Sequence, residues 1–117
     1  MAESQKANEV INEREDEALK DTGVLIYHVP TGNRCQIRAK VQKGSGRISV
    51  NGVPIFDLME AGKIRKTDEL IRVINRERLK NFDIDLDVGD ALSTDIFSPT
   101  VLAYAFAEAL TNLLGRL

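Results

Sequence analysis

The sequence has one cysteine, Cys35, one histidine, His28, and no tryptophan. A single cysteine excludes a disulfide framework, and one cysteine with one histidine is too few for a zinc site made from these residues. Because disulfides accumulate in oxidising compartments, we expect an intracellular chain. Aromatic residues make up only 5% of the 117 residues, so a surface that stacks several RNA bases on aromatic rings is not expected.

Long apolar runs are also missing. None approaches the roughly 20 residues that a membrane-spanning helix needs, so we expect no membrane partner. The opening MAESQKANEVINEREDEALKD contains seven carboxylates and no aromatic residue. It lacks the apolar core of a secretory signal and is too acidic for a typical organelle presequence. We interpret residues 1–21 as an exposed acidic arm or helix and residues 22–117 as one domain.

Charge is distributed unevenly around a formal net charge of −2. Residues 1–30 hold three Lys or Arg against seven Asp or Glu, and residues 81–117 hold one against six. Residues 31–80 hold twelve against five. A basic middle between acidic ends is typical of a protein with a polyanion on one face, although charge balancing within one domain would give the same pattern.

Alternation of apolar and polar residues predicts strands. GVLIYHV (residues 23–29) is rich in β-formers, and CQIRAKVQK (35–43), RISVN (47–51) and FDIDLDV (82–88) alternate. The inward residues are predicted to be Cys35, Ile37, Ala39, Val41, Ile48, Val50, Phe82, Ile84, Leu86 and Val88. The connection KGSG predicts a hairpin between the second and third strands, since glycines supply the positive φ angles of tight turns.

Three helices are predicted from capping residues and apolar spacing. Pro54 precedes a short helix over residues 55–60, and Thr67 caps a second helix. Ser98 and Pro99 begin a last helix that is apolar nearly all round and ends before Gly115, so it is expected at the centre of the core. We therefore predict an α+β fold, a two-layer sandwich with helices on one face of a mostly antiparallel four-stranded sheet.

No motif predicts catalysis, a cofactor or a small-molecule substrate. The glycines of GSGRISVNGVP precede a strand, whereas a nucleotide-binding loop opens a helix. Asp83, Asp85 and Asp87 suggest a metal site, but a calcium loop would need glycine in place of Val88, and strand alternation explains a solvated acidic face equally well. His28 has no nucleophile tied to it by any motif, and Cys35 belongs to the apolar side of its strand. We expect a protein that is not an enzyme.

The basic residues form two groups that are expected to bind the phosphates of structured RNA. Phosphate contacts need cations on a rigid face, and they do not depend on the base sequence. The first group lies on the predicted hairpin and consists of Arg34, Arg38, Lys40, Lys43 and Arg47. The second lies in the connection GKIRKT and consists of Lys63, Arg65 and Lys66. A solvated surface without a ligand is the alternative interpretation.

The stretch TGNRCQIRAKVQKGSGRISVNGVP resembles the opening of the small-subunit ribosomal protein nine family, in which basic residues lead to a Gly-x-Gly turn, a strand, Asn-Gly and x-Pro. FDIDLDV and AFAEAL are similar to a later strand and helix of that family. The corresponding positions are Gly32, Arg34, Ala39, Lys40, Val41, Gly44, Gly46, Ile48, Val50, Asn51, Gly52 and Pro54.

The resemblance implies the fold of the second domain of ribosomal protein five and binding to ribosomal RNA in the head of the small subunit, beside neighbouring ribosomal proteins. It also implies backbone contacts to RNA at Asn51 and Gly52. Asn33 and Cys35 replace basic family residues, and Ala103 and Glu108 stand where the family has arginines. The family's basic tail has no counterpart before Leu117, so no transfer-RNA contact is carried over.

The leading hypothesis is a divergent structural constituent of the small ribosomal subunit, in a mitochondrial ribosome or, alternatively, a cytosolic one. In this hypothesis the acidic strand face and the N-terminal arm point away from RNA. The competing hypothesis is a protein–protein adaptor of the same fold that has lost RNA binding.

Overall fold

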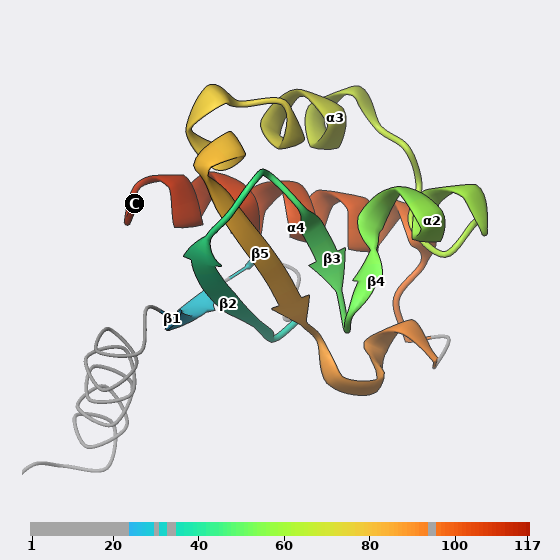
Figure 1. The fold of residues 1–117 in the computed structure, drawn as a ribbon. Coiled ribbons are helices and arrows are strands. Elements are labelled where there is room, and N and C mark those ends of the chain that lie inside the picture. The colour runs from blue at the N-terminus through green and yellow to red at the C-terminus, as the bar shows by residue number, and fades with distance from the viewer. Residues whose placement is uncertain (1–23, 30, 33–34, 94–95) are drawn as a thin grey trace, which may run out of the picture.

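The computed structural model describes residues 24–29, 31–32, 35–93 and 96–117 (Figure 1). The predicted acidic arm over residues 1–21 lies outside these ranges. In chain order the elements are β1 (Val24–Val29), β2 (Ile37–Lys43), β3 (Ile48–Val50), β4 (Val53–Pro54), α2 (Ile55–Glu60), α3 (Asp68–Ile74), the 3₁₀ turn η1 (Glu77–Asn81), β5 (Phe82–Asp87), the 3₁₀ turn η2 (Gly89–Leu92) and α4 (Pro99–Leu114).

The strands form one open, mixed sheet in the order β1-β2-β5-β3-β4. The pairs β1–β2, β2–β5 and β3–β4 are antiparallel, whereas β3 and β5 are parallel. The α+β class predicted from the sequence is confirmed. The predicted number of four strands is wrong, because the two-residue β4 is too short to show alternation. Three of the four strand pairs are antiparallel, as expected of a mostly antiparallel sheet, whereas the parallel pairing of β3 with β5 was not predicted, because alternation identifies strands but does not specify their neighbours.

The predicted hairpin between β2 and β3 is also wrong, since β5 lies between them (Figure 1). Lys43 is the register partner of Phe82 on one side of β5, and Ile48 is the partner of Ile84 on the other. The glycine loop between β2 and β3 crosses the start of β5, where Gly44 N donates to Asn81 O and Gly46 N donates to Phe82 O, both at 3.0 Å. Gly44 and Gly46, which suggest a tight turn in the sequence, therefore allow the loop to pass close to the start of β5.

The connection from β3 to the short strand β4 is a two-residue turn. Asn51 and Gly52 have φ angles of 50° and 82°. Positive φ at both central residues is typical of the type I′ turn, for which Asn-Gly is the preferred pair. The turn leads into the edge strand β4, and α2 begins directly after β4.

Helix α4 crosses behind the sheet in Figure 1, and the inward side chains of the strands are buried on that side. Ser98 Oγ accepts from Val101 N at 3.2 Å and Thr67 Oγ1 accepts from Leu70 N at 3.2 Å, which confirms both predicted N-caps. Nine residues of α4 are buried, as expected for the central helix. Nine of the ten predicted inward strand residues are buried, with Ala39, Val50 and Leu86 at 0% exposure, and Phe82 at the start of β5 is only partly buried. Among the described helices, none has the length and apolar character to cross a membrane.

The opposite face of the sheet carries the outward residues of β2 and β5 together. Arg38 is the register partner of Asp87, and Lys40 is the partner of Asp85. Directly opposed residues of an antiparallel pair project from the same face. The aspartates of β5 therefore share one face of the sheet with Arg38 and Lys40, because both strands bury their inward residues on the α4 side.

Candidate nucleic-acid interface

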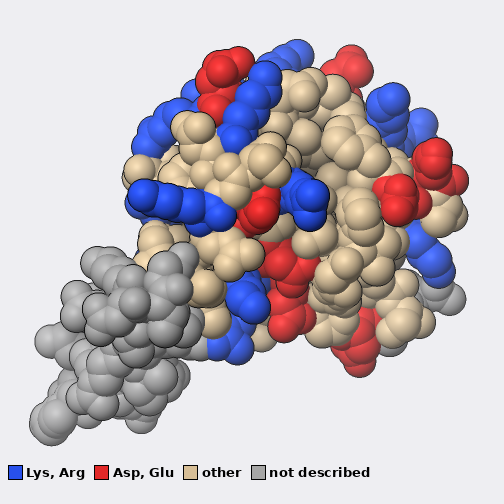
Figure 2. All heavy atoms as spheres, viewed as in Figure 1, with Lys and Arg blue, Asp and Glu red and all other residues tan. Residues whose placement is uncertain are grey.

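The exposed face of the sheet is electrostatically mixed. Figure 2 shows Asp and Glu side chains running through the middle of this face, along the line of β5 in Figure 1, with Lys and Arg on either side. A shallow depression of about 230 Å³ on this face is lined by Lys40, Gln42, Arg47, Ser49, Asp83, Ile84 and Asp85. A phosphate placed here would meet two carboxylates as well as two cations, so this face alone is a poor polyanion site.

The aspartates of β5 hold the neighbouring loops. Asp83 Oδ1 accepts from Ser45 N at 3.0 Å and from Arg47 N at 3.1 Å, and these main-chain hydrogen bonds hold the pKa of Asp83 below its usual value. Asp85 Oδ1 accepts from Ser49 Oγ at 2.6 Å and Gly52 N at 2.7 Å. The predicted solvated acidic face is thus a set of loop anchors.

Asp87 completes the row, because its Oδ1 accepts from Gly89 N at 2.9 Å. Across the described part of the chain, no three His, Cys, Asp or Glu side chains are grouped so that they could hold a metal ion. The spacing of the three aspartates is accounted for by the loops that each of them binds.

A more uniform positive surface lies at the end of the sheet where β2 ends and β5 begins. We call it the basic edge; its exposed residues are Lys43, Arg47, Arg76, Arg78 and Lys80. Loop 43–47 rests on η1: a Cβ built on Gly46 would lie 3.2 Å from the Cα of Lys80. In Figure 2 Lys and Arg side chains gather along the upper left border, where Figure 1 places η1 and the end of β2.

Two carboxylates lie within the basic edge or directly beside it, and both have partners. Glu77 Oε1 is 3.1 Å from Lys80 Nζ. Asp83 is hydrogen-bonded to the main chain of the loop, as described above. Five cations against these two carboxylates leave the basic edge with a local excess of positive charge, although the formal net charge of the chain is −2.

The first predicted basic group is divided by the fold. Lys43 belongs to the basic edge, and Arg47 lies at its border with the mixed sheet face, where it lines the same depression as Lys40. Arg38 lies near the opposite end of β2, about 17 Å from Lys43 at the ordinary rise of a strand. Arg34 lies outside the described residues.

The second predicted group, Lys63, Arg65 and Lys66, is exposed on the connection between α2 and α3. Arg65 N donates to Pro99 O at 3.0 Å, so this connection lies against the first residue of α4. No contact joins it to loop 43–47 or to η1 among the hydrogen bonds and ion pairs of the described residues. The two predicted groups are thus attached to different parts of the fold.

Asn51 and Gly52 use their polar groups inside the protein. Asn51 Nδ2 donates to Gly89 O at 2.8 Å, and its Oδ1 accepts from Val88 N at 3.0 Å. Gly52 N donates to Asp85. These bonds give both residues a structural role, and they leave the predicted RNA contacts there untested.

Sequence reasoning missed Arg76, Arg78 and Lys80. These three residues are among the twelve Lys and Arg counted over residues 31–80. They were not grouped with Lys43 and Arg47 because about thirty residues separate the two sets in the sequence. Only the crossing of loop 43–47 over η1 brings the two sets together.

No protein-family model matches this chain, and a search of curated proteins finds no relative.

Proposed function

We propose that the protein binds the phosphate backbone of structured RNA through its basic edge, as a structural constituent of the small ribosomal subunit. The observation that carries this proposal is the contact between loop 43–47 and η1, which gathers five exposed cations onto one rigid border of the sheet. Cations held on ordered backbone bind phosphates without reading bases, and this matches a surface with few aromatic residues.

Rigidity favours the basic edge over the other basic groups. Four N–H groups of the loop donate hydrogen bonds that fix it. Gly44 N donates to Asn81 O at the end of η1 and Gly46 N to Phe82 O at the start of β5. The N–H groups of Ser45 and Arg47 donate to the Asp83 carboxylate. A fixed loop loses little conformational entropy when it binds, so more of the electrostatic attraction remains as affinity. The sheet face, by contrast, places Asp85 beside Lys40.

The ribosomal part of the proposal rests on the resemblance of residues 31–54 to the small-subunit ribosomal protein nine family. In this proposal the RNA is that of the subunit head, and the ribosome is mitochondrial or, alternatively, cytosolic. The role is binding and not catalysis.

The proposal is tested by the affinity of the full chain for a transcript of the small-subunit head RNA, measured over a range of salt concentrations. A double variant, Lys43→Ala with Arg78→Ala, removes two cations of the basic edge. We expect about tenfold weaker binding at low salt and a salt slope reduced by about 1.5, since each phosphate contact contributes about 0.7–0.9.

The matched control removes two cations from the other predicted group, Lys63→Ala with Lys66→Ala. This variant has the same net charge as the first one, so a general electrostatic effect would weaken both equally. We expect the control to keep most of the affinity. Equal losses in the two variants, or no affinity of the unaltered chain for the transcript, would contradict the proposal.

A second candidate function is a protein–protein adaptor that does not bind RNA. The observation that favours it is the mixed charge of the exposed sheet face, together with exposed apolar side chains at Val53, Phe56, Ile96 and Tyr104. Protein partners use such combinations of charged and apolar surface. An adaptor would keep its partners after ribonuclease treatment, whereas an RNA-bound protein would be released.

A further inference from the structure

The first strand of the sheet begins beside the basic edge. β1 starts at Val24, whose register partner is Gln42, and Gln42 is followed directly by Lys43. On the other side of β2, Lys43 is the partner of Phe82, the first residue of β5 after η1. The start of β1, the end of β2 and the start of β5 therefore lie at one end of the sheet (Figure 1).

The segment that precedes β1 in the sequence is strongly acidic. Residues 1–21, the acidic arm, hold seven Asp or Glu against three Lys or Arg, which gives a formal charge of −4. Four of these carboxylates are concentrated in the stretch EREDE at residues 13–17. A segment with this charge is attracted to a nearby excess of positive charge, and the attraction weakens as salt is added.

The length of chain between this stretch and β1 is sufficient to reach the basic edge. Glu17 stands seven residues before Val24, and seven residues span up to about 23 Å when extended. Neighbouring strands lie about 4.8 Å apart, so β1 is about 10 Å from β5 across β2. η1, which carries Arg78 and Lys80, leads directly into β5. Both halves of the basic edge are thus within reach.

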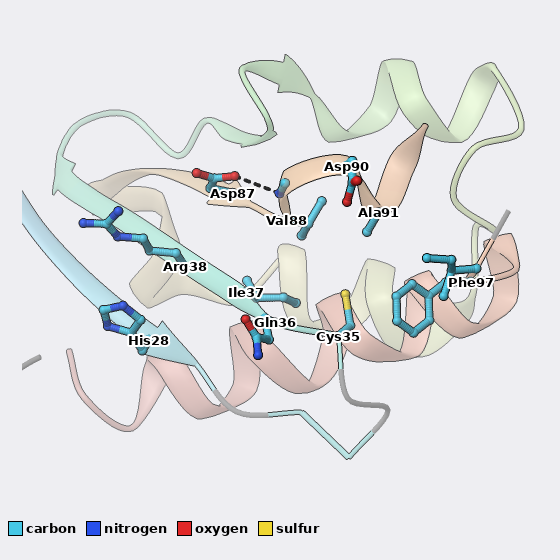
Figure 3. A pocket seen from close by; sticks show the side chains of 12 residues that line it. His28, Cys35, Gln36, Ile37, Arg38, Asp87, Val88, Asp90, Ala91 and Phe97 are labelled. Carbon is cyan, nitrogen blue, oxygen red and sulfur yellow. Dashed lines mark hydrogen bonds between the residues drawn. The ribbon is translucent and has the colours of Figure 1, made fainter. Parts of the chain in front are cut away.

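The opposite end of the sheet offers a less favourable surface to an acidic segment. A hollow of about 480 Å³ there has Arg38 on the wall formed by β2, and Asp87 and Asp90 on the wall formed by the end of β5 and η2 (Figure 3). The two carboxylates repel an acidic segment. The hollow is also farther from the arm, since β1 runs about 17 Å from Val24 to Val29.

We propose that the acidic arm contacts the basic edge through the carboxylates of residues 13–17 and is displaced when RNA phosphates bind there. The arm and the basic edge belong to one chain, so their effective concentration is on the order of millimolar and individually weak ion pairs suffice. Only a polyanion with several closely spaced phosphates then competes. The displacement rests on the proposed function, whereas the contact between the arm and the basic edge does not.

The contact is tested with a spin label on the arm of the full-length chain. Asn12→Cys places the label beside residues 13–17, and the thiol of Cys35 is only 3% exposed, so the label attaches to the arm. We expect the label to broaden the backbone amide NMR signals of Ser45, Gly46 and Asn81 at low salt. The signals of Gly89 and Ala91 at the other end of the sheet should keep their width.

Two variants connect the broadening to the carboxylates of the arm. The arm variant has Glu13→Gln, Glu15→Gln and Glu17→Gln. The matched control makes the same change of charge at exposed positions of α2 and α3, with Asp57→Asn, Glu60→Gln and Glu69→Gln. We expect about threefold less broadening in the arm variant and no change in the control. No broadening, equal broadening at both ends of the sheet, or equal broadening in the two variants would overturn the contact.

Displacement by RNA is measured with the transcript of the small-subunit head RNA. The arm variant should bind it about fivefold more tightly than the matched control at low salt, because the two have the same net charge and only the first has a weakened competitor. Equal affinities would overturn the displacement. No affinity of the unaltered chain or of either variant, with the broadening present, would contradict the proposed function and still support the contact of the arm.

Discussion

Two aspartate side chains of β5 hold neighbouring loops in place. Asp83 binds two N–H groups of the loop between β2 and β3, and Asp85 binds the turn between β3 and β4. Both residues belong to the central strand and reach a neighbouring loop from its exposed face. Their side chains therefore connect parts of the chain that are more than thirty residues apart in the sequence.

The first residue-scale prediction concerns Asp83 and pH. Its pKa is lowered in the folded protein because main-chain N–H groups of Ser45 and Arg47 stabilise the carboxylate. Its contribution to the free energy of unfolding is present above the unfolded-state pKa of about 3.9 and is lost as pH falls through the lower folded-state value. Asp83→Asn should therefore be less stable than the unaltered chain at neutral pH, and the difference should shrink below about pH 4.

Urea unfolding at several pH values measures this difference. Glu60→Gln is the control, since Glu60 is exposed at the end of α2. A difference for Asp83→Asn that stays constant between neutral and acidic pH would show that the carboxylate charge is not what holds the loop.

The second residue-scale prediction separates folding from RNA binding at Asn51. Asn51→Ala removes the bonds to Gly89 O and Val88 N and places alanine at a φ angle of 50°. We expect the free energy of unfolding to fall by about 1–3 kcal/mol. RNA affinity, measured at a temperature where the variant is folded, should remain unaltered. An affinity loss with no stability loss would instead make Asn51 an RNA contact.

At the scale of elements, alternation and capping predicted four of the five strands, the three described helices and most residues of the buried faces. Ile37, Ala39 and Val41 are buried, and Thr67 and Ser98 cap their helices. The neighbours of each strand could not be predicted, because β2 and β3 have the same pattern whether they pair with each other or with β5. The two-residue strand β4 is too short to show any period.

The same dependence on which segments lie side by side limits how much of the candidate site could be predicted from the sequence. Lys43 and Arg47 were recognised because they are close together in the sequence. Arg78 and Lys80 were not, since they join the basic edge only through the position of η1 under the loop. The common face of Arg38 and Asp87 was missed for the same reason: it depends on strand order, which local patterns do not contain.

The crossing of the loop over β5 gives a prediction at this scale. A Cβ at Gly44 would overlap the carboxylate of Asp83, which is held by two hydrogen bonds. Gly44→Ala should therefore lower the free energy of unfolding by about 1–3 kcal/mol and weaken RNA binding, because it displaces the loop that carries Lys43 and Arg47.

Gly115→Ala is the matched control for this change. Gly115 has a φ angle of −68° at the end of α4, and its nearest contact for a Cβ is 3.4 Å away. Thermal unfolding of both variants should show a change within about 1 kcal/mol for Gly115→Ala. Equal stability of the two variants would mean that Asp83 moves aside without cost.

On the scale of the whole molecule, the fold separates a basic surface from an acidic one, although the formal net charge is only −2. Cations gather at the basic edge, and carboxylates follow β5 across the exposed sheet face (Figure 2). The central claim is that the basic edge binds RNA.

Sedimentation of the native protein from gently lysed cells, with and without ribonuclease, tests that claim most directly. We expect the protein to migrate with the small ribosomal subunit and to move to light fractions after nuclease treatment. The RNA that migrates with it would identify the mitochondrial or the cytosolic ribosome. A light peak in untreated lysate, or a heavy peak that nuclease does not alter, would contradict RNA binding and favour the adaptor.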